Sequence, residues 1–138
     1  MRHLRALMES RPTPGRVPDQ SFVADTLAGA EHIRATRGQG YLFVYSPQGA
    51  AFALRSEPRP SLVREAWWFD PRDGRAQRIG RLAENQTIHS FTPPTRGRGQ
   101  DWVLVVDEER RRFSAPGETP GPTTQVDTTQ NWRLTAQP

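Results

Sequence analysis

Short apolar segments alternate with polar turns along the middle of the chain. Their spacing of about 8 to 14 residues, with Gly, Pro, Asp and Asn in the turns, is typical of the short strands of a small all-β fold. The expected strands are residues 31–37, 41–46, 50–56, 61–70, 75–82, 86–92 and 101–108. We expect about seven strands in one small antiparallel β-sandwich, with hairpins over 41–56 and 61–82.

The two ends of the chain do not follow this pattern. Leu4, Leu7 and Met8 are spaced like one face of an amphipathic helix, which predicts a short helix over residues 2–10, ended by Pro12. So short a helix is not stable alone in water, so its apolar face must pack against something. The chain then divides into a helical segment and connection (1–30), a β-sandwich domain (31–113) and a flexible Pro/Gly/Thr-rich tail (114–138).

Two adjacent tryptophans lie in the fourth expected strand, where neighbouring side chains point to opposite faces. Trp67 shares a face with Val63 and Phe69, and we assign this more apolar face to the core. Trp68 is then expected on the outer face, beside Arg64. There it would either pack under a neighbouring element or form an open surface for a sugar ring or a peptide.

The expected core collects the inward-facing residues of the strands. It comprises Ile33, Leu42, Val44, Phe52, Leu54, Val63, Trp67, Phe69, Ile79, Leu82, Ile88, Phe91, Trp102, Leu104 and Val106. The faces of each strand are assigned together, because a register shift of one residue moves every side chain to the other face.

Composition narrows the classes of function. The chain has 138 residues and a formal net charge of +4, and all 19 basic residues are arginine. It has no cysteine, and His3, His32 and His89 lack metal-ligand spacing, so we expect no metal and no cofactor. No apolar stretch is long enough for a membrane span or a signal peptide. No aromatic residues alternate with the arginines as they do on nucleic-acid surfaces, so we expect neither membrane nor nucleic acid as a partner.

Catalytic motifs are equally weak. No Ser or Thr has the sequence context of an activated nucleophile. A glycosidase needs two carboxylates that face each other across a cleft. Glu65 and Glu84 could be nominated for that role, but no motif marks them. Catalysis is therefore the least favoured interpretation.

Four stretches of the chain carry its most specific motifs. They are "LMESRPTPGRVPDQS", "IRATRGQGYLFVYSPQGAAFAL", "AWWFDPRDGRAQRIGRL" and "FTPPTRGRGQDWVLVVDE". Together they resemble the C-terminal part of secreted bacterial proteins similar to apiosidase-like glycoside hydrolases. In that family a (β/α) barrel carries the catalytic carboxylates. A small β-sandwich follows, described as a "putative collagen-binding domain of a collagenase". The resemblance covers about residues 3–108, and residues 41–49, 66–74 and 91–107 are its most specific part.

The resemblance implies that the helix at residues 2–10 corresponds to the end of the last barrel helix. It also implies that this chain lacks the barrel, its catalytic acids and its export signal. We therefore expect a non-catalytic accessory domain, secreted or periplasmic, that binds a polysaccharide or a collagen-like polymer. The alternative is a structural module that braces a hydrolase barrel.

Aromatic and arginine side chains are the candidates for polymer binding, since rings stack on sugars or prolines and guanidinium groups donate hydrogen bonds. The candidate ligand-binding residues are Trp68, Tyr41, Tyr45, Arg64, Arg75 and Arg78. A row of exposed aromatic rings away from the N-terminal helix would indicate binding. An exposed apolar patch around that helix would indicate bracing.

Overall fold

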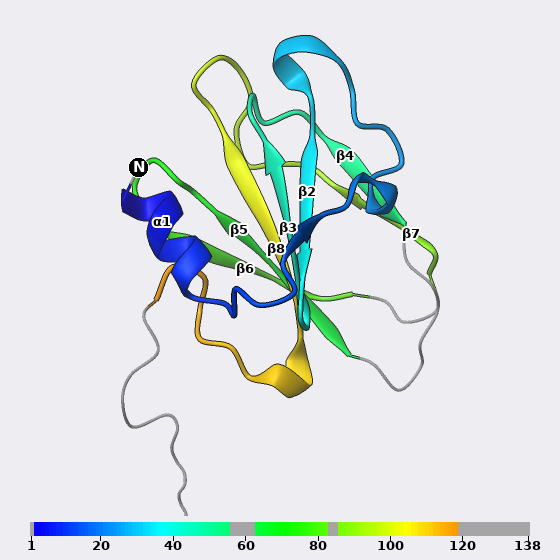
Figure 1. The fold of residues 1–138 in the computed structure, drawn as a ribbon. Coiled ribbons are helices and arrows are strands. Elements are labelled where there is room, and N and C mark those ends of the chain that lie inside the picture. Colours follow the sequence, from blue (N-terminus) through cyan, green and yellow to red (C-terminus); the bar gives the residue numbers. More distant parts are fainter. Residues whose placement is uncertain (1, 56–62, 83–85, 119–138) are drawn as a thin grey trace, which may run out of the picture.

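A computed structural model describes residues 2–55, 63–82 and 86–118 of the chain (Figure 1). In chain order the elements are α1 (Arg2–Glu9), β1 (Val17–Pro18), η1 (Gln20–Phe22), η2 (Gly29–Glu31), β2 (Arg34–Gly38), β3 (Tyr41–Ser46), β4 (Phe52–Arg55), β5 (Arg64–Phe69), β6 (Ala76–Arg81), β7 (Ile88–Phe91), β8 (Trp102–Glu108) and η3 (Glu109–Arg111). The expected short N-terminal helix and the expected strands are all present, most of them with slightly shorter bounds.

The strands form two antiparallel sheets, which confirms the small all-β fold. The larger sheet has the order β1-β2-β3-β8-β5-β6, and the smaller sheet consists of β4 and β7. Within the described residues there are eight strands, because the short edge strand β1 adds to those that the sequence predicts. Figure 1 shows the larger sheet as a twisted layer, with β4 and β7 on one side and α1 on the other.

One expected hairpin is confirmed and the other is wrong. Strands β5 and β6 pair directly through a turn in which Gly74 adopts a φ of +79° and donates to the carbonyl of Asp70. Strand β3 instead pairs with β2 and β8, while β4 crosses to the second sheet and pairs with β7. At the crossing, Gly49 has a φ of +69° and lies against the backbone of Thr95. This close approach leaves no room for a side chain at Gly49. The segment is a tight corner that leads the chain from the larger sheet to the smaller one.

The larger sheet is covered on both faces, because a different element packs against each. The core between the sheets contains Val23, Ile33, Ala35, Leu42, Val44, Phe52, Leu54, Ala66, Trp68, Phe91, Trp102, Leu104 and Val106. The cluster on the helix face contains Leu7, Tyr41, Phe43, Phe69, Val103 and Val105, with Trp67 and Phe113 packed against it. The two faces therefore hold separate hydrophobic clusters.

The expected face assignment of β5 is wrong. Trp68 is 5% exposed and lies between the sheets, with its ring centroid 6.0 Å from that of Phe52 and 6.3 Å from those of Phe91 and Trp102. Trp67 is half-buried on the helix face. The assignment placed the more apolar face, with Trp67 and Phe69, in the core between the sheets, whereas that face packs under α1 and the face of Trp68 meets the smaller sheet. Both tryptophans are therefore packing residues.

Most other expected core residues are buried, and two are not. Ile79 is 44% exposed and Ile88 is 49% exposed. Ile79 lies on the edge strand β6, where the pairing with β5 shifts register, so its side chain leaves the regular alternation. Ile88 begins β7, at the open end of the space between the sheets, and its exposed side chain alternates with the buried His89 and Phe91. Val63 and Leu82 are half-buried.

One buried and one half-buried arginine bond the N-terminal segment to the sheet. Arg11 is 3% exposed and donates to both carboxylate oxygens of Asp107 at 3.0 and 2.7 Å. Arg16 donates to the Tyr41 hydroxyl at 2.7 Å and to the carbonyl of Met8 at 2.6 Å. These bonds hold the residues after α1 on the sheet, so the helix packs as part of this domain.

The beginning of the expected tail also packs on the helix face. Pro116 is buried, and the amide of Gly117 donates to the Ser10 hydroxyl at 3.4 Å. A side chain at Gly117 would collide with the ring of Phe69. The rest of the expected flexible tail, residues 119–138, lies outside the described residues.

Candidate functional site

A groove opens between the two sheets at one end of the sandwich. Its cavity volume is about 780 Å³, within the range of about 300–1,000 Å³ typical of ligand sites. The groove is formed by the ends of strands. Antiparallel pairing brings the starts of β3 and β5 beside the end of β8, and it brings the end of β4 beside the start of β7. The described lining residues are Ser21, Phe22, Arg37, Gly38, Gly40, Tyr41, Leu42, Leu54, Arg55, Arg64, Leu82, Thr87, Ile88, His89, Val106 and Glu108.

The groove combines an apolar base with a polar rim. Leu42, Leu54 and Val106 belong to the core between the sheets and form the buried part of its lining. Ile88 contributes a half-exposed aliphatic side chain at the opening. A cleft of this composition can bury the apolar faces of a ligand while hydrogen-bond donors at the rim orient it.

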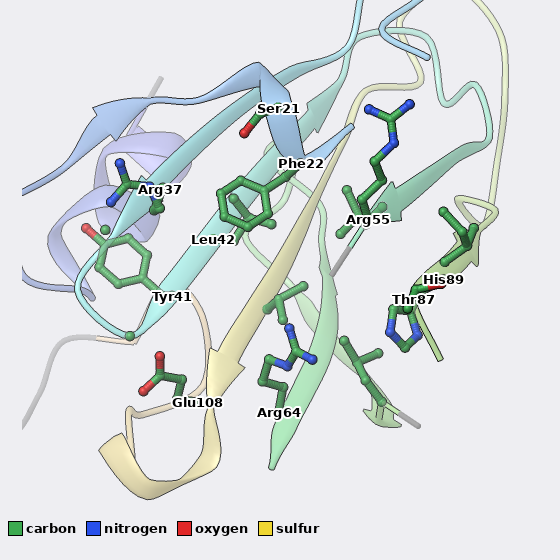
Figure 2. Close-up of a pocket in the computed structure, with 16 residues that line it drawn as sticks. Ser21, Phe22, Arg37, Tyr41, Leu42, Arg55, Arg64, Thr87, His89 and Glu108 are labelled. Carbon is green, nitrogen blue, oxygen red and sulfur yellow. The ribbon is translucent and has the colours of Figure 1, made fainter. Parts of the chain in front are cut away.

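The charged residues of the groove are mainly basic. Three arginines and one glutamate line it, which gives the described lining a formal charge of +2 with His89 neutral. In Figure 2 Arg37 lies toward one side and Arg55 and His89 toward the other, with Arg64 between them. Arg37 also pairs with Asp19 at 3.0 Å, outside the lining.

His89 is a buried polar residue of this groove, 6% exposed. Burial lowers its pKa, and the positive charge of Arg64 lowers it further, while a hydrogen bond with the backbone of Gln86 acts in the opposite direction. The imidazole is therefore neutral at neutral pH. An anion bound beside Arg64 would favour the protonated form of His89.

The structure does not bring the six expected site residues together. Tyr41 and Arg64 line the groove. Trp68 lies in the core, which contradicts its expected place on the outer face. Arg75 lies at the turn between β5 and β6, where it pairs with Asp73 at 3.8 Å, and Arg78 pairs with Glu65 at 3.2 Å. Tyr45 donates to Asp101 at 3.0 Å.

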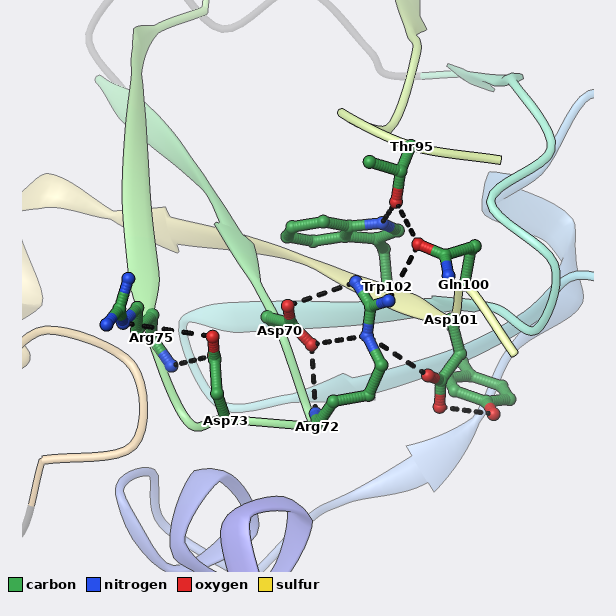
Figure 3. A network of polar contacts seen from close by, with 9 residues as sticks. Asp70, Arg72, Asp73, Arg75, Thr95, Gln100, Asp101 and Trp102 are labelled. Atoms are coloured by element: carbon green, nitrogen blue, oxygen red, sulfur yellow. Dashed lines mark hydrogen bonds and ion pairs between the residues drawn. The ribbon is translucent and has the colours of Figure 1, made fainter. Parts of the chain in front are cut away.

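A polar network closes the opposite end of the sandwich (Figure 3). Arg72 donates to both carboxylate oxygens of Asp70 at 2.8 and 3.0 Å and to Gln100 at 2.7 Å. Its guanidinium carbon lies 5.3 Å from the centroid of the Trp102 ring. Burial, together with the hydrogen bond to Asp101, raises the pKa of Tyr45 to about 12. These side chains satisfy one another, which is the arrangement of a structural network rather than of an open site.

Sequence reasoning missed Arg55, Ile88 and His89 as groove residues. They come from β4 and β7, which are neighbours only in the smaller sheet. Predicting β3 and β4 as a hairpin places β4 in the wrong sheet and hides this convergence. The continuous apolar runs of β3 and β8, rather than alternating ones, are the sequence signal of a sheet buried on both faces.

The described part of the chain has neither a metal-binding cluster nor a membrane-spanning helix. No group of three or more His, Asp or Glu residues there could hold a metal ion. No helix among the described residues is both long and apolar enough to cross a membrane.

Comparison with known proteins places this architecture in a family. The family described as "Putative collagen-binding domain of a collagenase" matches residues 17–107. A solved structure titled "Glycoside hydrolase" is 30% identical, with a TM-score of 0.69 over 78% of this chain and 24% of that one. A glycoside hydrolase family 5 protein from Bacteroides vulgatus ATCC 8482 is 27% identical, with a TM-score of 0.73 over 89% of this chain and 27% of its own.

The chain therefore spans about a quarter of each of these two glycoside hydrolases. No curated protein matches it. The family match extends from β1 into β8, and so includes both sheets and most of the residues that line the groove. This chain belongs to the family described as the putative collagen-binding domain of a collagenase.

Proposed function

We propose that this chain is a non-catalytic accessory domain of a glycoside-hydrolase-like protein and that it binds a polysaccharide in the groove between its sheets. The groove itself carries the proposal: a cavity of about 780 Å³ with a buried aliphatic base and several side-chain donors at its rim. The titles of both similar structures name glycoside hydrolases, which favours a carbohydrate over a protein ligand. Such a domain acts where its polymer is, so we also propose a secreted or periplasmic location.

The distribution of aromatic side chains supports a groove rather than a flat stacking surface. In the described part of the chain every Trp, Tyr and Phe is buried or half-buried, and the exposed large hydrophobic residues are Val17, Ile79 and Ile88. A row of exposed rings is therefore not the basis of binding here. Of the three exposed residues, Ile88 lies in the groove.

The carboxylates of the groove support a non-catalytic role. Glycoside hydrolysis ordinarily uses two carboxylates that face each other across the bond to be cleaved. Among the described lining residues Glu108 is the one carboxylate, and it pairs with Arg110 at 3.0 Å. Glu65 lies outside the lining and pairs with Arg78. Glu84 lies outside the described residues.

A second candidate function is bracing of a hydrolase barrel, and one observation favours it. A smaller apolar hollow of about 210 Å³ lies beside α1, and its lining includes Leu4, Met8, Phe43 and Val103. A partner domain packed against α1 would bury these side chains. This second function predicts no affinity for any polymer.

Two isoleucines of similar exposure provide a matched test. Ile88 lies in the groove and Ile79 lies on β6, outside it. Ile88→Ser should weaken binding to a retained polysaccharide roughly fivefold, because about half of its side chain is available for burial by a ligand. Ile79→Ser should leave the dissociation constant within about twofold. Retention on insoluble neutral polysaccharides, cross-linked polygalacturonate and fibrillar collagen, followed by titration, measures both.

The results of these measurements distinguish polysaccharide binding in the groove from bracing of a barrel. Selective weakening by Ile88→Ser supports binding in the groove. Equal effects of the two variants, or no retention on any polysaccharide, would overturn it, and the second result would favour bracing. Retention on collagen alone would replace the polysaccharide with a protein ligand.

A further inference from the structure

We infer that the groove selects polysaccharides whose sugars carry methyl groups, either in O-acetyl substituents or as the methyl group of 6-deoxy sugars. This inference rests on the proposed function, because it specifies the ligand class of the same groove. Its basis is the aliphatic character of the groove base, together with the way in which the aromatic rings of the lining are already packed.

The apolar part of the groove is mainly aliphatic and comes from both sheets. Its aliphatic members among the described lining residues are Leu42 of β3, Leu54 of β4, Ile88 of β7, Val106 of β8 and Leu82, which follows β6. The residues of β3, β4 and β8 are buried, Leu82 is half-buried and Ile88 is exposed. Because these side chains are branched and converge from several strands, they present methyl groups to a ligand rather than one flat plane.

The two aromatic residues of the lining are engaged in packing. Tyr41 is 5% exposed, its ring centroid lies 4.9 Å from that of Phe43, and its hydroxyl accepts a hydrogen bond from Arg16. Phe22 is half-buried and packs against the core between the sheets. Neither residue is therefore an exposed platform for stacking on the flat face of a sugar.

An aliphatic base of this kind distinguishes methyl groups from hydroxyl groups. A sugar hydroxyl that leaves water without a new hydrogen-bond partner is unfavourable. A methyl group in the same place gains by leaving water. In hydrophobic pockets one such group is worth roughly tenfold or more in discrimination. The groove should therefore prefer a sugar that carries a methyl group to the same sugar without it.

Polar side chains at the rim could orient an acetyl ester. The side chains of Arg55 and Thr87 are exposed, and Arg55 lies opposite Ile88 in the pairing of β4 with β7. Figure 2 shows both of them toward the same side of the groove. An ester carbonyl is a neutral hydrogen-bond acceptor, so a guanidinium or hydroxyl donor could bind it while its methyl group contacts Ile88 or Leu54.

The test uses two matched pairs of soluble oligosaccharides. Acetylated xylo-oligosaccharides are compared with the same preparation after mild alkaline removal of the acetyl groups, and a cello-oligosaccharide is compared with its 6-deoxy derivative. Calorimetric titration should show about tenfold tighter binding of the methyl-bearing member of at least one pair. A preference in the first pair alone would identify acetyl esters as the ligand, and a preference in the second pair alone would identify 6-deoxy sugars.

Substitutions of similar size then test whether the aliphatic lining causes the preference. Ile88→Thr introduces a hydroxyl into the groove, whereas Ile88→Val keeps an aliphatic side chain of nearly the same size as threonine. Ile88→Thr should lower the preference at least about threefold relative to Ile88→Val. Ile79→Thr, at a residue of similar exposure outside the groove, should leave the preference within about twofold of the parent chain. Thermal unfolding checks that each variant is folded.

Four results would overturn the inference. The first is equal affinity within both pairs; if Ile88→Ser still weakened retention on a polysaccharide, the proposed function would stand. The second is a preference that is the same in Ile88→Thr and Ile88→Val. The third is a large and equal loss of all ligands in Phe22→Leu, which would show stacking on that ring. The fourth is no binding of any of these oligosaccharides, in which case retention on the polymers would still decide the proposed function.

Discussion

At the scale of single residues, the adjacent tryptophans of β5 have different structural roles. Trp68 contacts three aromatic rings between the sheets, whereas Trp67 packs on the helix face with its indole nitrogen buried and without a hydrogen-bond partner. An unsatisfied buried donor carries a desolvation penalty of about 1–3 kcal/mol. The less buried tryptophan is therefore also the one whose polar atom is poorly accommodated.

This difference predicts that substitution of Trp68 affects stability much more than substitution of Trp67 by another aromatic residue. Trp68→Ala should lower the free energy of unfolding by about 3–5 kcal/mol, as expected for a large aromatic side chain removed from a core. Trp67→Phe should change it by less than about 1 kcal/mol, because it removes the unsatisfied donor and keeps an aromatic ring. Urea denaturation measures both. A larger loss from Trp67→Phe than from Trp68→Ala would contradict the burial described for β5.

His89 should make stability depend on pH. Its folded-state pKa lies below the ordinary value of 6.5, because of burial and then Arg64, so below pH 6.5 the unfolded chain takes up a proton that the folded chain does not. The free energy of unfolding should fall as the pH is lowered through 6.5 and level off below the folded-state pKa. His89→Gln should abolish this pH dependence of the free energy of unfolding, whereas His32→Gln should leave it in place. Denaturation between pH 5 and 8 tests the slope, and an unchanged slope in His89→Gln would contradict it.

At the scale of elements, the contact between the N-terminal segment and β8 depends on one buried ion pair. Arg11 and Asp107 are each 3% exposed and form two hydrogen bonds. Burial raises the pKa of Asp107, although the bonds from Arg11 oppose that shift. Removing one member of such a pair is more harmful than removing both, because it leaves a buried charge without compensation.

Arg11→Met should therefore destabilise the domain by about 3–5 kcal/mol near neutral pH. Without the guanidinium, the folded-state pKa of Asp107 rises further above its unfolded value, so the folded chain gains a proton and the loss becomes smaller as the pH falls. Arg11→Met/Asp107→Asn should recover part of the stability. Thermal unfolding at pH 5 and 8 measures these effects. A double variant less stable than Arg11→Met would contradict the account.

The elements also show what the sequence can and cannot predict. The presence of β3 and β5 follows from local composition and from the turn at Gly74, because strand propensity and turn chemistry are local. Which face of β5 lies between the sheets cannot be predicted in this way, because it depends on α1 covering the second face of the sheet. Nor does the sheet to which β4 belongs follow from sequence, because a corner at Gly49 and a hairpin turn have similar compositions.

At the scale of the whole molecule, the groove is a consequence of topology rather than of a motif. Tyr41 and Arg64 could be proposed from residue type alone, and both reach the groove. Arg55 and His89 reach it because β4 and β7 pair in a separate sheet. A sequence pattern can therefore predict this family's fold well and the candidate site only in part, since the groove is assembled from the ends of strands in both layers.

The contact between Gly117 and Ser10 has a consequence for how the domain can be attached to another. The segment that leads out of α1 and the last described residues lie together on the helix face of the larger sheet. A covalent neighbour joined before α1 or after the last described residues would be tethered from that same side. The groove opens on the other face of the larger sheet, toward β4 and β7, so such a linkage would leave it accessible to a polymer too large to enter an enzyme's own cleft.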